Sequence, residues 1–383
     1  MSKFVLIPDS FKGTLSSMEI CKILKGIIER FYPEAEIISV PVADGGEGSV
    51  DCFLSALGGE RISVNCKGPY MEDICAFYGL LSGGEIAVVE MSATAGLPMV
   101  EGRKNPLSTT TYGVGELILH AAKNGAKHII VGLGGSCTND FGCGAAYACG
   151  VRFYDKNGKS FMPVGATLCD VEKIDISQKS TLLNGVEIVT MCDIDNPPYG
   201  IDGAARVFAP QKGADEREVE LLDCGVKHIC DLVRKQFGKD ISMLSGGGAA
   251  GAMGAGMVVF FDSILKAGIE TVLETVDFSN IIKGADMIIT GEGKIDSQSL
   301  RGKVVIGVAR AAKEFNIPLI AVVGGAEGDM TDAYTQGVTA IFPINRLPQD
   351  FSISRYHSAE NLAFTMENIL RFFNTTRKTK TEG

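Results

Sequence analysis

Short apolar runs and amphipathic stretches alternate at the start of the chain. Residues 4–7 are apolar and lead into a polar turn, after which apolar residues recur at helical spacing. Ser16 and Glu19 have the spacing of a capping box, which marks the start of this helix. A second apolar run, 37–42, enters a glycine-rich turn directly. The first 42 residues therefore predict a strand, a helix and a second strand.

The same alternation of apolar runs and glycine turns is found at the far end of the chain. Apolar runs at 287–290 and 319–323 each enter a glycine turn, and a third apolar run follows at 340–343. Strands that alternate with helices through such turns indicate a parallel sheet with helices on both faces. Two strands from the start and three from the end would make one five-stranded sheet.

The length of the chain and this pattern together predict two domains. With 383 residues, the chain exceeds the roughly 250 that one hydrophobic core supports. We expect an α/β fold in which residues 1–65 and 285–383 form one discontinuous domain and residues 66–284 form an inserted α/β domain. The insert has its own periodic segments, with helices at 116–123 and 215–237 and strands at 128–131 and 186–191. Residues 241–261 carry no charge, but their six glycines indicate a loop that runs into a buried helix, not a membrane span.

Charge and cysteine usage restrict the class of partner. The formal net charge is −10 and no basic block precedes the short tail, so a nucleic acid is not expected as a partner. An acidic protein still binds phosphate where backbone N–H groups and helix N-termini point at the anion. The eleven cysteines include no C-x-x-C pair, and the apolar run at 4–7 is too short for a signal peptide. We therefore expect a cytoplasmic protein with reduced thiols.

Glycine is the outstanding feature of the composition, because the 47 glycines gather where apolar strands end. Glycine lets backbone N–H groups approach a phosphate closely, and a helix start that follows adds favourable potential. A single loop of this kind is also explained by a tight strand-to-helix turn, but several in one chain favour phosphate binding. The main loops are 45–48, 132–135, 246–251, 291–293 and 324–325.

Two familiar nucleotide motifs are absent. Gly158-Lys159-Ser160 resembles the end of a Walker A loop, but Phe153 occupies the place of its first glycine. Residues 246–251 satisfy G-x-G-x-x-G, yet no clear strand precedes them. A dehydrogenase is therefore not favoured.

Acidic and basic side chains lie in the same turns. Phosphoryl transfer needs carboxylates, both to hold a hard cation and to accept the proton of the acceptor hydroxyl. Any one of these acids could instead cap a helix or form an Asx turn, but the set as a whole favours a reaction site. The acids are Asp9, Asp44, Glu47, Asp140, Asp193, Asp195, Glu292 and Asp296, and the cations are Lys12, Lys294, Arg301 and Lys303.

At these residues the sequence resembles the glycerate kinases of the type widespread in bacteria. The matching stretches include PDSFKG at 8–13, VADGGEG at 42–48, GGSCTND at 134–140, CDIDNP at 192–197, FAPQKGA at 208–214, GGGAAGAMGAG at 246–256 and GEGKIDSQSLRGK at 291–303. The resemblance covers essentially the whole chain, and Cys137 is a small departure where relatives usually have alanine. It implies ATP-dependent phosphorylation of D-glycerate with Mg²⁺, 2-phosphoglycerate being the favoured product. It also implies an active-site cleft between a Rossmann-like domain and the inserted α/β domain.

Roles follow from the resemblance as hypotheses. Asp193 would orient the hydroxyl and accept its proton, with Asp296 in reserve. The glycerate carboxylate would be held by Ser10, Lys12 and Arg301, and the metal by Asp44, Glu47 and Glu292. The phosphates would be bound by Gly134, Gly135, Ser136, Thr138, Asn139, Gly247, Gly248 and Gly251. Two alternatives stay open: a kinase for another small hydroxy acid, and a non-catalytic sensor of sugar acids or nucleotides.

Overall fold

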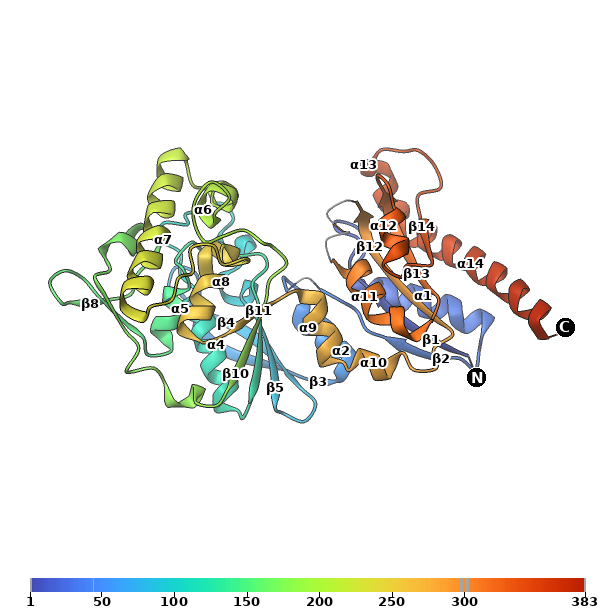
Figure 1. Cartoon of the computed structure of the whole chain (residues 1–383), viewed down its shortest axis with the longest axis horizontal. Coiled ribbons are helices and arrows are strands. Elements are labelled where there is room, and N and C mark those ends of the chain that lie inside the picture. The colour runs from blue at the N-terminus through green and yellow to red at the C-terminus, as the bar shows by residue number, and fades with distance from the viewer. Residues whose placement is uncertain (1, 44, 297–298, 300–302, 382–383) are drawn as a thin grey trace. The chain divides into compact units, whose positions relative to one another are not determined.

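The computed structural model describes residues 2–43, 45–296, 299 and 303–381. The chain divides into two compact units. Unit 1 consists of Met1–Ala43 and Ile269–Gly383, and unit 2 of Asp44–Gly268 (Figure 1). Each unit is an α/β structure with its own sheet and core.

The boundaries of the units differ from those expected from the sequence. Residues 45–65, expected in the first domain, lie in unit 2, and residues 269–284, expected in the insert, lie in unit 1. Packing explains both shifts. The helix α2 (Ser49–Leu57) packs on β4 (Asp73–Leu81), and β3 (Gly59–Lys67) pairs with β4 over its full length. At the other boundary, the side chain of Ile269 packs against Gly307 of α11 (Val304–Ala312).

Unit 1 is built on the expected five-stranded parallel sheet, which is confirmed in the order β14-β13-β12-β1-β2. Its strands are β1 (Lys3–Pro8), β2 (Glu36–Ser39), β12 (Met287–Ile295), β13 (Leu319–Ala326) and β14 (Ala340–Pro343). Its helices are α1 (Ser17–Phe31), α9 (Gly268–Thr275), α10 (Phe278–Ile281), α11, α12 (Thr331–Thr335), α13 (Phe351–Ser354) and α14 (Ser358–Thr381). The predicted capping box at Ser16 and Glu19 begins α1. Alternation along β1 sends Phe4 and Leu6 into a core shared with α1 and α14.

The strand order of unit 1 reverses between β1 and β12. The chain runs from β1 to β2 on one side, then continues from β12 to β13 and β14 on the other side of β1. In open parallel sheets, ligands bind outside the carboxyl ends of the strands at such a switch point. The segments that follow β1 and β12 are therefore the first place to look for a site in this unit.

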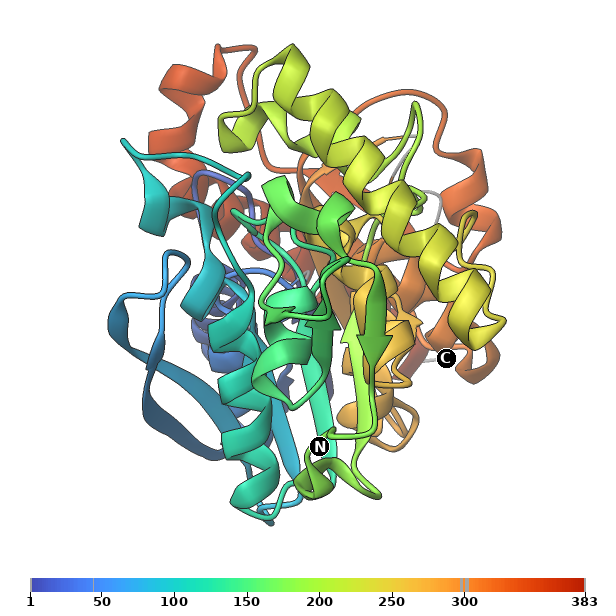
Figure 2. The same ribbon diagram turned by 90° about the vertical axis from the view of Figure 1, so that its left-hand side faces the viewer.

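Unit 2 contains a six-stranded mixed sheet in the order β11-β10-β6-β5-β4-β3 and a three-stranded sheet. Besides β3 and β4, its strands are β5 (Ile86–Glu90), β6 (His128–Gly132), β10 (Glu187–Met191), β11 (Ile264–Lys266), and the smaller β7 (Arg152–Tyr154), β8 (Ser160–Phe161) and β9 (Lys173–Asp175). Its helices are α2, α3 (Ser92–Ala95), α4 (Tyr112–Lys123), α5 (Cys143–Ala148), α6 (Ala204–Phe208), α7 (Glu216–Phe237) and α8 (Ala249–Phe260). Figure 2 looks onto this unit, with α4 in front of the strands that it packs against.

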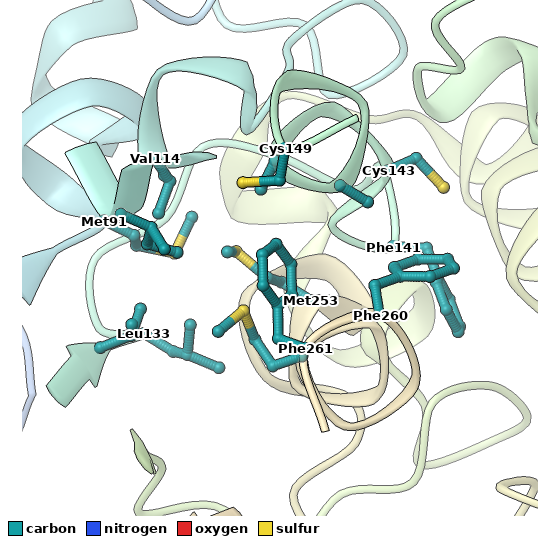
Figure 3. Packing of buried hydrophobic residues seen from close by; sticks show 14 of the residues in the cluster. Met91, Val114, Leu133, Phe141, Cys143, Cys149, Met253, Phe260 and Phe261 are labelled. Atoms are coloured by element: carbon teal, nitrogen blue, oxygen red, sulfur yellow. The ribbon is translucent and has the colours of Figure 1, made fainter. Parts of the chain in front are cut away.

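The core of unit 2 surrounds the uncharged segment singled out in the sequence. That segment forms the buried helix α8, as expected, and Phe260 lies edge-on to Phe141 with ring centroids 6.1 Å apart (Figure 3). Met253 and Phe261 come from the same segment and join this cluster. Among the helices in the described ranges, none is long and apolar enough to cross a bilayer.

Candidate active site

In unit 1, the segment that follows β1 contacts the second half of β12. The amide of Asp9 donates to the carbonyl of Gly291 at 2.8 Å. A Cβ on Gly293 would lie 3.2 Å from the backbone nitrogen of Lys12, and a Cβ on Gly291 would overlap the carbonyl of Val322 on β13. Glycine is required at 291 because the backbone of Val322 approaches it closely, whereas a side chain at 293 would need only a small shift of its neighbour. The predicted glycine turn 291–293 is thus the end of β12 itself.

Glu292 is the buried carboxyl group of this region. Its side chain lies on β12 and is 6% exposed, and the hydroxyl of Ser299 donates to Oε2 at 3.1 Å. Its Oε1 has no hydrogen-bond partner among the residues that the structure describes. The pKa of Glu292 is raised to about 7, mainly by burial. The charges of Asp9 and Asp296 also act to raise this pKa, while Ser299 and Lys303 act to lower it. A carboxyl group poised near neutral pH is typical of a functional site.

Of the other predicted residues of unit 1, the structure describes Ser10, Lys12 and Asp296, and the charges of Asp9 and Asp296 act on the pKa of Glu292. The amide of Ser10 donates to Oδ1 of Asp9 at 2.6 Å, and the amide of Ser299 donates to Oδ1 of Asp296 at 3.3 Å. Lys12 is exposed in the turn after β1. Arg301 lies outside the described residues.

In unit 2, two turns meet at the carboxyl ends of β6 and β10. The amide of Gly134 donates to the carbonyl of Gly45 at 3.0 Å, and a Cβ on Gly134 would lie 2.5 Å from Cα of Gly46. Gly45, which has φ of +78°, also approaches Met191 at the end of β10. The turn 45–48 therefore belongs with the loop 134–140 of this unit. Of the two metal candidates here, Glu47 is exposed and Asp44 lies outside the described residues.

The two glycine loops assigned to phosphates are in direct contact. The amide of Phe141 donates to the carbonyl of Gly251 at 3.1 Å, and a Cβ on Gly251 would overlap the carbonyl of Thr138. Ala250, Gly251 and Ala252 all have positive φ, of 54°, 68° and 67°. Alanine rarely adopts this conformation, and such strain is concentrated at functional sites. Gly247 and Gly248 lie against the segment 196–198, and the amide of Gly248 donates to the carbonyl of Asn196 at 2.9 Å.

The polar side chains of the loop 134–140 are almost entirely buried. Asn139 is 0% exposed, and neither its Oδ1 nor its Nδ2 has a partner in the described part of the chain. The hydroxyl of Thr138 is likewise buried without a partner there. Unpaired buried polar atoms are costly, so this loop carries hydrogen-bonding capacity that its own fold leaves unused.

Asp140 has a structural role in the same loop. It accepts hydrogen bonds from the amide and hydroxyl of Thr111 at 2.8 and 2.9 Å, and from the amides of Gly142 and Gly144. Burial raises the pKa of this fully enclosed carboxyl group, whereas these hydrogen bonds lower it. Asp140 therefore anchors the loop to the start of α4 and α5, which agrees with the turn reading of this acid.

Asp193 lies two residues beyond the end of β10, in unit 2. Its side chain is exposed, and its Oδ1 accepts a hydrogen bond from the amide of Gly268 at 2.7 Å. Cys192 beside it approaches Gly246 of the second glycine loop. Asp193 is thus held at the same edge of the sheet as the two glycine loops.

Comparisons with known proteins identify the family. The model of the "Glycerate kinase family" matches residues 4–374. The chain belongs to this family. It is 43% identical over 368 residues to a glycerate kinase of Bacillus cereus, covering 96% of this chain and 97% of that protein. The glycerate 2-kinase of Escherichia coli K12 is 40% identical, with 89% and 90% covered. A solved structure assigned provisionally as glycerate kinase 2 of Salmonella typhimurium LT2 superimposes with a TM-score of 0.87 at 37% identity, covering 98% and 99% of the two chains.

The resemblance inferred from the sequence motifs is therefore confirmed. Lys212 lies in one of those motifs, and no role was assigned to it from the sequence. Lys212, inside the stretch 208–214, is only 2% exposed. Its Nζ donates to Oγ of Ser136 and to the carbonyl of Thr138, each at 2.7 Å. In the sequence, Lys212 lies between Gln211 and Gly213, and an exposed lysine in a turn shows the same pattern.

Among the described residues, no group of three or more His, Cys, Asp or Glu side chains is arranged to hold a metal ion. Mg²⁺ usually keeps several waters and binds one or two carboxylates together with substrate phosphates. The unpaired Oε1 of Glu292 would supply one such carboxylate ligand.

Proposed function

We propose that this protein transfers the γ-phosphoryl group of ATP to a hydroxyl of D-glycerate, with 2-phosphoglycerate as the favoured product. The observation that carries this proposal is the match to the glycerate kinase family over residues 4–374. The 40% identity to a protein named glycerate 2-kinase favours the 2-hydroxyl as the acceptor.

Phosphate binding is assigned to the two touching glycine loops of unit 2. In these loops the amides of Gly134, Cys137, Gly247, Gly248 and Ala249 already donate to backbone carbonyls. The remaining N–H groups of residues 134–139 and 247–251 would bind the phosphates, and the unpaired side-chain amide of Asn139 would add a donor. Fixed donors of this kind stabilise the charge on a transferring phosphoryl group without reorganisation. Mg²⁺ would neutralise the phosphate oxygens, with Glu292 as its best-supported carboxylate and with Asp44 and Glu47 as further candidates.

The acceptor hydroxyl is assigned to Asp193. The carboxylate would orient the hydroxyl in line with the γ-phosphorus and accept its proton as the new O–P bond forms. Asp296 remains the reserve for this role. Ser10, Lys12 and Arg301 would bind the carboxylate of glycerate, because a cation and hydroxyl donors match that group.

The cellular compartment and the partners of the enzyme are inferred from its thiols and its charge. All eleven cysteines are free, which suits a reducing compartment, so we place the enzyme in the cytoplasm. The partners are small molecules, and the net charge of −10 opposes binding to nucleic acid.

The direct test is ADP release from MgATP across a panel of small hydroxy acids, followed by phosphorus NMR of the product. Turnover with D-glycerate and phosphate on C2 supports the proposal. Turnover only with a different hydroxy acid, or ligand binding without any turnover, overturns it.

The assignment of the base is tested by Asp193→Asn, with Asp195→Asn as the neighbouring control. We expect the Asp193 variant to lose at least about 100-fold in kcat while remaining folded by circular dichroism. Nearly full activity in that variant would remove Asp193 from the mechanism. In the same assay, Lys12→Met should raise the KM for glycerate far more than that for ATP.

A further inference from the structure

Lys212 is a buried cation without an ionic partner. It lies in the short turn 210–212, and within the described ranges no carboxylate approaches its Nζ to within 4.0 Å. Its two hydrogen-bond acceptors are a hydroxyl and a carbonyl, which are neutral groups. Burying an unpaired charge destabilises the folded protein, so we infer that Lys212 has a role other than stabilising the fold.

The two acceptors of Lys212 lie in the loop 134–139. The loop is also held by backbone hydrogen bonds, from the amide of Leu97 to Gly135 and from the amide of Cys137 to Ala95. Lys212 adds side-chain hydrogen bonds at two further positions of the loop, Ser136 and Thr138. The carbonyl of Thr138 is also the atom that Gly251 approaches most closely, so the ammonium group lies where both glycine loops meet.

The charge of Lys212 and the unused polar atoms beside it are complementary to an anion. Asn139 and Thr138 carry buried polar atoms without partners in the described residues, directly next to the carbonyl that Lys212 binds. We propose that Lys212 is a positioning residue for ATP: it fixes the loop 134–139 and supplies the positive potential that a bound phosphate needs there. This proposal rests on the proposed kinase function.

The ionisation of Lys212 gives the proposal a measurable signature. Burial lowers the pKa of its ammonium group to about 8, while Cys137 and Asp140 raise it. The other charged groups nearby are Lys104, which packs against Gly213, and Arg206 on α6, whose Nε is 3.5 Å from Asp223. Because kcat/KM reports the ionisation of the free enzyme, kcat/KM for ATP should fall as the pH rises through about 8.

The experiment measures kcat and KM of the full chain with MgATP and D-glycerate between pH 6 and 10. We compare the wild type with Lys212→Met, which keeps the length and removes the charge, and with Lys212→Arg, which keeps the charge at all pH values. Lys227→Met, at an exposed position on α7, is the matched control. Lys212→Met should lower kcat/KM for ATP by about 100-fold, with a smaller change in the KM for glycerate. Lys212→Arg should retain most activity and lose the alkaline fall near pH 8.

Two results would overturn the proposal: a Lys212→Met variant with wild-type kcat/KM for ATP, or an unchanged alkaline limb in Lys212→Arg. If Lys212→Met does not fold, the pH profile of Lys212→Arg decides. If neither folds, Ser136→Ala decides: loss of this acceptor should move the alkaline midpoint to lower pH, and an unmoved midpoint refutes the role. Absence of wild-type turnover with glycerate would instead refute the proposed function, so the two failures are distinguishable.

Discussion

Replacing Glu292 with glutamine should stabilise the protein at alkaline pH and inactivate it. The carboxyl group is 6% exposed, and Ser299 donates to it. Its pKa rises from the ordinary 4.5 to about 7 in the folded protein. Between these two values the unfolded chain has lost the proton while the folded chain keeps it, so wild-type stability falls as the pH rises through this window.

The size of the effect follows from the same shift. Each pKa unit corresponds to about 1.4 kcal/mol, so the full linkage is about 3 kcal/mol. Glutamine resembles the protonated acid and carries no such penalty. We expect Glu292→Gln to exceed the wild type by about 3 kcal/mol in the free energy of unfolding at pH 8, and by less than about 1 kcal/mol at pH 5.

The assay is urea unfolding at pH 5 and pH 8 in magnesium-free buffer, with Glu314→Gln as an exposed control in the same unit. The control should change stability by less than about 0.5 kcal/mol at either pH. A difference between Glu292→Gln and the wild type that is the same at both pH values would refute the reasoning. The proposed contact of Glu292 with the metal predicts that the more stable variant has little kinase activity, as in other stability and activity trade-offs.

Further predictions concern the packing of unit 2. Gly251→Ala forces a Cβ into the carbonyl of Thr138 and should cost several kcal/mol in thermal unfolding; Gly158→Ala, also at positive φ but in open space, should cost only about 1 kcal/mol. Equal losses in the two variants would show that backbone conformation alone matters. Phe260→Ala removes a ring that is 2% exposed and should cost about 3 to 5 kcal/mol in urea unfolding. A loss below about 1 kcal/mol would mean that the cluster in Figure 3 repacks around the gap.

The sheet of unit 1 could be predicted because its signals are local. Each of its strands contains an apolar run, and the capping residue Ser16 marks the first helix. The ends of two strands were predicted wrongly, because β12 and β13 continue through the glycines 291–293 and 324–325 that were expected to form turns. The unit boundary could not be read in the same way. Val50 and Leu54 of α2 pack against Gly79 of β4, and nothing within residues 49–57 reveals that partner.

Some features of the candidate site could likewise be predicted from the sequence, and others could not. Glycine loops next to acids are visible in a sequence, and the contact of Gly251 with Thr138 agrees with their assignment to one site. Burial is a property of the folded chain, so neither the raised pKa of Glu292 nor the unpaired ammonium of Lys212 could be predicted from composition or spacing.

The split of unit 1 along the chain has a consequence for synthesis on the ribosome. Its first part ends at residue 43, and about 225 residues of unit 2 are made before its second part begins. The interior strand β1 pairs with β12 on one side, so at about 5 to 20 residues per second it waits at least ten seconds for that neighbour. Phe4, Val5, Leu6 and Ile7, all 0% exposed in the finished fold, lack their full covering during that time. A nascent chain that stalls within unit 2 would therefore expose β1, and aggregation during expression should begin there.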